Sequence, residues 1–207
     1  MKKKIFSYQQ IVLFVTSLSF CFYLLGYENF NFSNQSWLIN GDLAQYQLGW
    51  KFYRDDIWRF PLGLNPNYGI TNSSSIIYSD SIPLLAIFFK IFKNFLFEDF
   101  QYFSFWIFIC IYLQALFSFK IIFYFTKNTP YSLVSSLFFI FSTILIYRSG
   151  IHLSLTAHWL ILGYFYAQIS AVNNKDLKKH LIIYLSILIH FYFSLILMGI
   201  FFLEKII

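Results

Sequence analysis

Long apolar runs alternate with short polar breaks along most of the chain. Each run approaches the roughly 20 residues that a helix needs to cross about 30 Å of hydrocarbon. The runs cover residues 5–26, 101–126, 131–147, 153–172 and 181–203. This pattern predicts an all-α integral membrane protein, with about five transmembrane helices in a single membrane domain over residues 1–207.

The one large polar segment, residues 27–100, separates the first apolar run from the others. Within it, apolar side chains repeat every three or four residues, a spacing that predicts an amphipathic helix near 42–58. The residues of this stripe are Leu43, Tyr46, Trp50, Tyr53 and Ile57. The residues expected on the opposite, solvated side are Gln47, Lys51, Arg54 and Asp55.

A second helix is expected near 81–97, with Pro83 in its first turn. From Pro83 it would rise only about 22 Å, which is short of the hydrocarbon thickness. Lys90, Lys93 and Asn94 share one side of it, three and four residues apart, and form a polar stripe. We therefore predict an interfacial helix that lies along the membrane rather than across it.

The distribution of lysines gives the orientation. If 81–97 does not cross the membrane, then Lys127 and the lysines of 175–179 fall on the same side as those of residues 2–4. Short cytoplasmic loops carry an excess of Lys and Arg, so this arrangement places the N-terminus in the cytoplasm. Residues 5–26 then form an uncleaved first helix, and 27–100 form an outer loop.

Composition supports a membrane protein and excludes a soluble domain. Of the 207 residues, 58% are hydrophobic and 12% are charged, whereas soluble domains carry about 25% charged residues. The net charge of +6 does not indicate nucleic-acid binding, because the lysines lie at the ends of apolar runs, where they meet lipid headgroups. Membrane lipids are therefore the expected partner. Cys21 and Cys110 lie inside apolar runs and are interpreted as packing residues.

Two acidic residues of the outer loop are candidates for chemistry. Asp42 follows the turn Asn40–Gly41 and is either a helix N-cap or a general base that deprotonates an acceptor hydroxyl. Asp80 is either a cap for the second helix or a ligand, with Asp42, for a divalent metal such as Mg²⁺ or Mn²⁺. The spacing of the two residues does not establish that they are close together.

Three basic or titratable side chains are expected on the same outer side. Arg148 and His152 lie at the outer junction, and His158 lies a few residues inside the next run. They either snorkel and form interhelical hydrogen bonds, or clamp a phosphate at the headgroup level. His190, in the middle of the last run, is interpreted as a core histidine that is hydrogen-bonded.

The arrangement of a first helix, an outer loop with an early acidic residue and two juxtamembrane helices resembles the GT-C superfamily of membrane glycosyltransferases. Protein mannosyltransferases and aminoarabinose transferases are examples. More specifically, several short motifs look like those of a family of bacterial multi-pass membrane proteins whose activity is uncharacterised. They are Gly41-Asp42 with Gln45, Gly49-Trp50, Arg54, Trp58, Pro61-Leu62-Gly63, Asp80-Ser81-Ile82-Pro83-Leu84-Leu85 and the region of His158-Trp159.

The resemblance implies transfer of a sugar from a polyprenyl-phosphate donor to an acceptor on the outer face of a bacterial inner membrane. It also implies that Asp42 is the catalytic base. The residues expected to bind substrate are Asp80, Gln45, Trp50, Arg54, Arg148, His152 and His158. Full members of the family look longer, so we expect this chain to be the N-terminal portion of a larger protein.

A second hypothesis assigns no transferase activity to the chain. In this interpretation it is a transporter or flippase of lipid-linked saccharides, or a subunit of a polymerase. Such proteins keep charged side chains along a path through the bundle. The concentration of polar residues in one loop favours a surface reaction site instead.

Overall fold

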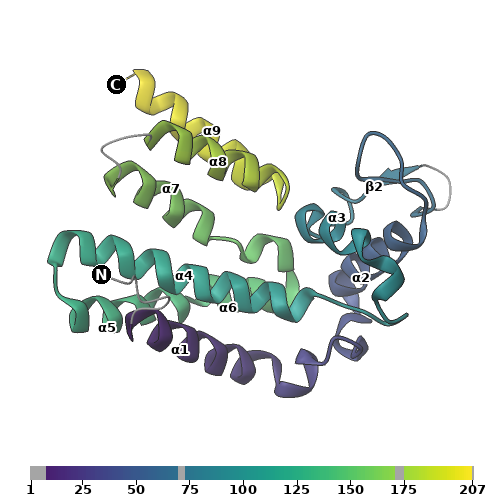
Figure 1. Ribbon diagram of the computed structural model, residues 1–207, viewed down its shortest axis with the longest axis horizontal. Coiled ribbons are helices and arrows are strands. Elements are labelled where there is room, and N and C mark those ends of the chain that lie inside the picture. The colour runs from purple at the N-terminus through teal and green to yellow at the C-terminus, as the bar shows by residue number, and fades with distance from the viewer. Residues whose placement is uncertain (1–7, 70–72, 171–174, 207) are drawn as a thin grey trace.

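The computed structural model describes residues 8–69, 73–170 and 175–206. The protein is all-α apart from one pair of two-residue strands, which confirms the predicted fold class at this level. Two lobes follow one another along the long axis of the molecule (Figure 1). We call them the helical lobe, which contains α1 and α4 to α9, and the polar lobe, which is the described part of residues 27–100.

The helical lobe is built on two long helices, α1 (Tyr8–Leu25) and α4 (Phe103–Thr126). Within the described residues these two are long and apolar enough to cross a membrane. They pack directly on each other, with the ring of Phe14 edge-on to that of Phe108 at 5.2 Å. Cys21 and Cys110 are buried free thiols, as expected of packing residues.

The run at 131–147 is not one helix, contrary to the prediction. It forms α5 (Thr129–Ile140) and α6 (Thr143–Ile151), which are bent by 47° relative to each other. Ser142 stabilises the start of α6 at the break, because its side-chain oxygen accepts the backbone N–H of Leu145. If the bent pair is one span, the number of candidate spans in the described residues rises from two to three.

The run at 153–172 begins with a short 3₁₀ helix, η4 (Leu153–Thr156), before α7 (Trp159–Ser170). The predicted helix therefore starts later than expected, and its last two residues lie outside the described residues. At the start of this segment, the carbonyl of Leu153 accepts the indole N–H of Trp106 at 2.7 Å. This bond ties η4 to α4.

The run at 181–203 is also broken, which corrects the prediction of a single last helix. α8 (Lys175–Ile187) and α9 (Phe191–Ile206) form an antiparallel hairpin that turns at residues 188–190 (Figure 1). Two ion pairs join the beginning of α8 to the end of α9. They are Lys179–Glu204 at 2.6 Å and Lys205–Asp176 at 2.9 Å. The end of α9 therefore lies beside the start of α8, whereas a single helix would place residues 181 and 203 at opposite ends of the lobe.

The polar lobe contains α2 (Gly41–Asp55), α3 (Pro83–Ile91) and the antiparallel strands β1 (Leu64–Asn65) and β2 (Ser74–Ser75). The described part of the polar lobe also contains three short 3₁₀ helices: η1 (Tyr27–Phe30), η2 (Ser36–Leu38) and η3 (Lys93–Phe95). α2 starts where the apolar stripe predicts but ends before Ile57, which is exposed. α3 has nine residues and rises about 14 Å, too little to cross a bilayer.

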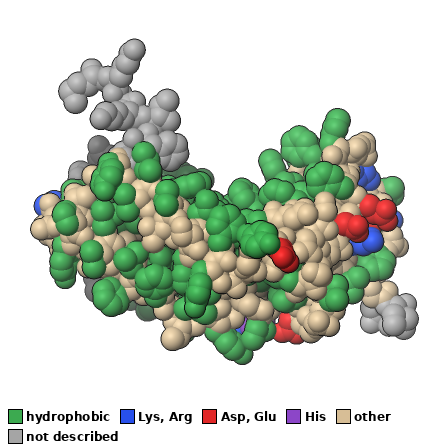
Figure 2. Space-filling view, turned by 90° about the horizontal axis from the view of Figure 1, so that it is seen from below, with side chains coloured by type: hydrophobic (Ala, Val, Ile, Leu, Met, Phe, Trp, Pro, Cys, Tyr) green, Lys and Arg blue, Asp and Glu red, His purple; other side chains and the backbone are tan. Residues whose placement is uncertain are grey.

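Hydrophobic side chains cover most of the helical lobe on the face that Figure 2 shows, whereas charged side chains gather mainly over the polar lobe. One exception is an exposed apolar stripe that runs from α3 into η3. It consists of Phe88 and Ile91 on α3, Phe92 directly after it, and Phe95 in η3. Of the predicted polar stripe, Lys90 and Lys93 face the lobe and donate to its backbone carbonyls, whereas Asn94 is exposed.

Lys90 is the clearest departure from the predicted solvated stripe on α3. Only 1% of its surface is exposed. Its Nζ lies over the rings of Tyr53 and Trp58, at 4.0 and 5.0 Å from their centroids. It also donates to the carbonyl oxygen of Ile57 at 3.2 Å. Burial lowers the pKa of Lys90 to about 8, and the nearby carboxylate of Asp56 opposes part of this shift.

This lowered pKa predicts that the contribution of Lys90 to stability rises with pH. Between about 8 and 10.5, folded Lys90 has released a proton that the unfolded chain still binds, so raising the pH favours folding. We expect Lys90→Met to remove this rise, which is on the order of 2–3 kcal/mol. Chemical denaturation in detergent at pH 7.5 and 10 would measure it. Lys93→Met removes only a minor cause of the shift and leaves Lys90 buried, so it should keep most of the rise. Equal slopes for wild type and Lys90→Met would contradict the prediction.

Candidate functional site

Asp42 lies in the first turn of α2 but does not cap it. The N-cap is Asn40, and Gly41 adopts a left-handed φ of 57° at the entrance to the helix. The Asp42 carboxylate instead faces the helical lobe, where its Oδ2 lies 3.5 Å from Nδ1 of His152. His152 directly follows α6, and both side chains keep access to solvent. Asp42 and His152, which the sequence placed on one face, therefore meet.

Asp80 makes a second contact of the same kind with the helical lobe. Its Oδ1 lies 3.3 Å from Nε2 of His190, in the turn between α8 and α9. Asp80 does not cap α3, because two residues separate it from Pro83 and the N-cap is Ile82. Both Asp80 and Ile82 have a φ of 53°, a left-handed conformation that side chains disfavour.

Tyr46 lies within electrostatic reach of both carboxylates. Its side chain is buried on α2, beside Ser154 and the backbone of Leu153 in η4. Burial raises the pKa of the Tyr46 phenol, and Asp80 and Asp42 raise it further, in that order. Both acidic residues therefore act on one hydroxyl group at the junction of the lobes. The sequence had assigned Tyr46 to the apolar stripe alone.

Two of the predicted substrate-binding residues, Gln45 and Trp50, hold the polar lobe together. Gln45 donates to the carbonyl of Tyr78 at 3.1 Å, beside the Asp80 segment. The Trp50 side chain has no exposed surface, and its indole N–H donates to the carbonyl of Phe100 at 3.0 Å. Such contacts indicate a structural role for both, and a direct contact with substrate stays a prediction.

Arg54 is buried, contrary to its predicted place on the solvated side of α2. Its guanidinium donates to the carbonyls of Phe97 and Glu98, at 3.0 and 2.8 Å. These carbonyls follow η3, so Arg54 anchors the segment that leads out of the polar lobe into α4. Gln47, also predicted to be solvated, is buried as well.

Arg148 and His158 belong to neither acid–histidine pair among the described residues. Arg148 lines an open hollow of about 510 Å³ on α6, together with Thr143 and Tyr147. It is within electrostatic reach of His158. The His158 ring is edge-on to Phe193, in the first turn of α9, at 5.9 Å. A phosphate clamp by these side chains stays a prediction.

A family model described as a domain of unknown function (DUF6311) matches residues 14–206. The chain belongs to the DUF6311 family. The match runs from α1 to α9, so the two lobes and both acid–histidine pairs lie within the family domain. No curated protein and no solved structure matches the chain.

A metal site in the DUF6311 domain would have to be built from few ligands. Among the described residues, no three side chains of His, Cys, Asp or Glu come together to hold an ion. Asp42 and Asp80 face different histidines rather than each other. The available donors are therefore two separate acid–histidine pairs. Binding of Mg²⁺ or Mn²⁺ by Asp42 and Asp80 stays a prediction.

His190 is the residue of the candidate site that the sequence did not identify as a site residue. A histidine inside an apolar run of 181–203 suggested a core residue within a continuous helix. The helix instead ends at Ile187 and a new one starts at Phe191, so His190 sits in a turn. Neither Pro nor Gly marks this turn, and the sequence therefore carries no local signal for it.

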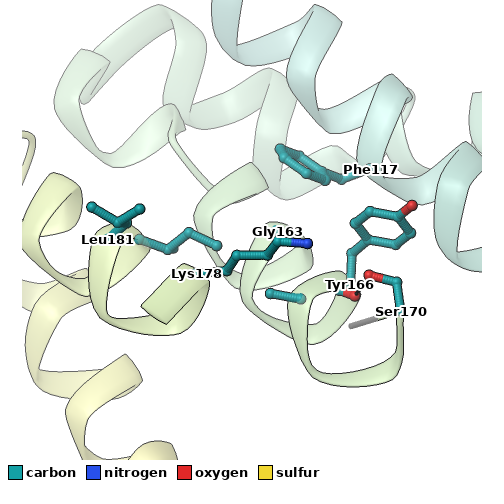
Figure 3. Close-up of a pocket in the computed structure, with 8 residues that line it drawn as sticks. Phe117, Gly163, Tyr166, Ser170, Lys178 and Leu181 are labelled. Carbon is teal, nitrogen blue, oxygen red and sulfur yellow. Dashed lines mark hydrogen bonds between the residues drawn. The ribbon is translucent and has the colours of Figure 1, made fainter. Parts of the chain in front are cut away.

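A cavity of about 330 Å³ lies elsewhere in the DUF6311 domain, between α4, α7 and α8. Figure 3 shows the rings of Phe117 and Tyr166 on one side of it, with Lys178 extending toward them from α8. The residues that line it belong to none of α2, α3 and the two acid–histidine pairs. It is therefore separate from the candidate site.

Proposed function

We propose that the protein is an integral membrane glycosyltransferase of the GT-C type. It transfers a sugar from a polyprenyl-phosphate donor to an acceptor on the outer side of a bacterial inner membrane. The observation that carries the proposal is the convergence of Asp42 and Asp80 on two histidines where the polar and helical lobes meet. This junction suits a substrate that is half lipid and half sugar.

The arrangement of charges supports the membrane location and its orientation. Lys127 follows α4 at the end of the helical lobe away from the polar lobe, and the ion pairs of α8 and α9 lie toward the same end (Figure 1). With the N-terminus in the cytoplasm, the positive-inside rule assigns this end to the cytoplasm. The polar lobe and its carboxylates then face outward.

Asp42 is the base in this mechanism. Its carboxylate accepts the proton of an acceptor hydroxyl while the oxygen of that hydroxyl forms a bond to the anomeric carbon of the sugar. The bond from this carbon to the lipid phosphate breaks, and its electron pair leaves with the phosphate. His152, 3.5 Å away, orients the Asp42 carboxylate. With more than half of its side-chain surface exposed, Asp42 is accessible to an acceptor from the water side.

The phosphate of the donor is bound by cationic and hydrogen-bonding side chains on the helical lobe. Arg148 borders an open hollow on α6, and His158 lies within its electrostatic reach. Asp80 binds sugar hydroxyls, or a divalent metal if the reaction needs one. Gln45, Trp50 and Arg54 contribute by fixing the backbone of the polar lobe.

One observation favours a transporter or flippase of lipid-linked saccharides as a second candidate. α5 and α6 form a bent pair, and α8 and α9 form a hairpin of two short helices. Interrupted helices of this kind are common at the substrate sites of transporters. Against it, the described carboxylates of the site lie at the lobe junction and not along a path through the helical lobe.

Purified protein in lipid nanodiscs, given a radiolabelled polyprenyl-phosphate hexose, tests both candidates. For a glycosyltransferase, label leaves the lipid fraction in the presence of an acceptor hydroxyl, and free polyprenyl phosphate accumulates. For a flippase in sealed vesicles, label changes leaflet but stays on the lipid. Label that neither leaves the lipid nor changes leaflet would overturn both. Added Mg²⁺ or chelator shows whether transfer depends on a metal.

A further inference from the structure

The turn between α8 and α9 touches the Asp80 segment at two points. The carbonyl of Leu188 accepts the backbone N–H of Leu84, in the first turn of α3, at 2.7 Å. Two residues further on, Nε2 of His190 lies 3.3 Å from Oδ1 of Asp80. The first N–H groups of a helix have no partner within that helix. The hairpin turn therefore satisfies one of these groups in α3 and places a side chain against the adjacent carboxylate.

The second ring nitrogen of His190 determines which tautomer faces Asp80. The backbone N–H of Tyr192 donates to Nδ1 at 3.2 Å. A ring nitrogen that accepts a hydrogen bond carries no proton, so the neutral ring carries its proton on Nε2. This is the nitrogen that faces Asp80. The ring is 7% exposed and stacks on Phe191 with centroids 5.3 Å apart, so its orientation is held by packing.

The backbone around Asp80 is fixed from the other side by the polar lobe. The Ser81 hydroxyl donates to the carbonyl of Tyr46 at 2.7 Å. The hydroxyl oxygens of Ser79 and Ser81 lie 2.9 Å apart. The Tyr102 hydroxyl donates to the carbonyl of Ser81. These contacts hold the main chain in its left-handed conformation but leave the direction of the Asp80 carboxylate to be set by what faces it.

We propose that His190 is a positioning residue for Asp80 and that the α8–α9 hairpin forms one wall of the site. The catalytic meaning of this inference rests on the proposed function. The Nε2–H group donates to Oδ1 of Asp80, which leaves Oδ2 to accept from a substrate hydroxyl. One third of the Asp80 side chain remains exposed for that purpose. A carboxylate held in one direction by such a partner is preorganised for binding.

A double-mutant cycle on the transfer reaction tests whether His190 acts through Asp80. We expect His190→Leu to lower kcat/KM roughly tenfold to a hundredfold, because the carboxylate loses its orienting donor. In the Asp80→Asn background the same change should cost less than about twofold. Equal losses in both backgrounds, or no loss in the wild-type background, would overturn the proposal.

Two further variants separate positioning from a loss of folding. His190→Gln keeps an N–H donor and should recover most of the activity that His190→Leu loses, whereas a requirement for bulk alone predicts no such recovery. His180→Leu is the matched control, because His180 lies on the same hairpin and its Nδ1 contacts the carbonyl of Asp176 at the opposite end. We expect this control to retain transfer.

A spectroscopic readout keeps the inference testable if the protein transfers no sugar. In protein labelled with ¹⁵N-histidine and held in detergent micelles, we expect the His190 ring to show a protonated Nε2 and an unprotonated Nδ1. Asp80→Asn should shift the Nε2 signal and leave the His180 signals in place. A proton on Nδ1, or an Nε2 signal that Asp80→Asn does not move, would refute the pairing. A confirmed pairing without transfer would refute only the proposed function.

Discussion

Asp42→Asn is expected to lower the rate of sugar transfer by about 10²- to 10⁴-fold, with normal expression and membrane insertion. An amide has the shape of the carboxylate but cannot accept the proton of the acceptor hydroxyl. The contact with His152 is 3.5 Å long and solvent-accessible, so its change costs little stability. Initial rates with a polyprenyl-phosphate hexose, together with the thermal unfolding midpoint in detergent, would measure both effects.

The matched control for this prediction lies on the same helix. Asp55 and Asp42 are equally exposed, each at 56% of the side-chain surface, and Asp55 is also paired to one side chain, Arg54, at 3.0 Å. Asp55→Asn removes a charge of the same sign from α2, but the partner of Asp55 is Arg54 rather than a histidine of the helical lobe. We expect it to retain wild-type transfer. Wild-type rates for Asp42→Asn, or equal losses in both variants, would remove Asp42 from the mechanism.

Gly49→Ala is expected to disrupt the polar lobe, at a cost of more than about 3 kcal/mol in the free energy of unfolding. A Cβ atom at Gly49 would lie 2.2 Å from the hydroxyl oxygen and 2.3 Å from the Cβ of Ser79, and 2.6 Å from the Ser81 hydroxyl. Both serines are buried, so the backbone around Asp80 would have to move away from α2. Transfer activity should fall as well, because this movement separates Asp80 from His190.

The control for Gly49 is a glycine in a helix where a methyl group meets nothing. A Cβ at Gly199, inside α9, has no neighbour within 4 Å. Gly199→Ala should therefore leave stability unchanged or raise it by up to about 1 kcal/mol, because alanine favours helices. Thermal unfolding of both variants in the same detergent decides the matter. A Gly49→Ala protein as stable as wild type would show that the close approach of α2 to the Asp80 segment is not needed.

Features that depend on local sequence were predictable. The spacing of apolar residues placed the start of α2 within one residue, and Pro83 marked the start of α3. The positive-inside rule brought Asp42 and His152 to one face, where the structure pairs them. These signals are carried by neighbouring residues or by the ends of apolar runs, so one sequence suffices to interpret them.

Features that depend on tertiary contacts were not predictable. The turn at His190 is stabilised by partners in other segments, since Leu188 accepts from α3 and the hairpin ends are joined by ion pairs. Lys90 was expected in solvent because lysine is rarely buried, yet Tyr53 and Trp58 enclose it. The structural contacts of Trp50 had no signal either, because its partner is a backbone carbonyl fifty positions away.

The hairpin of α8 and α9 also bears on how the chain is inserted during synthesis. The two helices, of 13 and 16 residues, rise about 20 and 24 Å, and each is shorter than the hydrocarbon layer. Each also carries charges: Lys179–Glu204 and Lys205–Asp176 pair between the two helices, and Lys179 also pairs with Asp176 within α8. In the proposed membrane location, neither helix would cross the bilayer favourably by itself. We then expect both to insert together, after α9 has been synthesised, so that Asp80 can meet His190 only at that point.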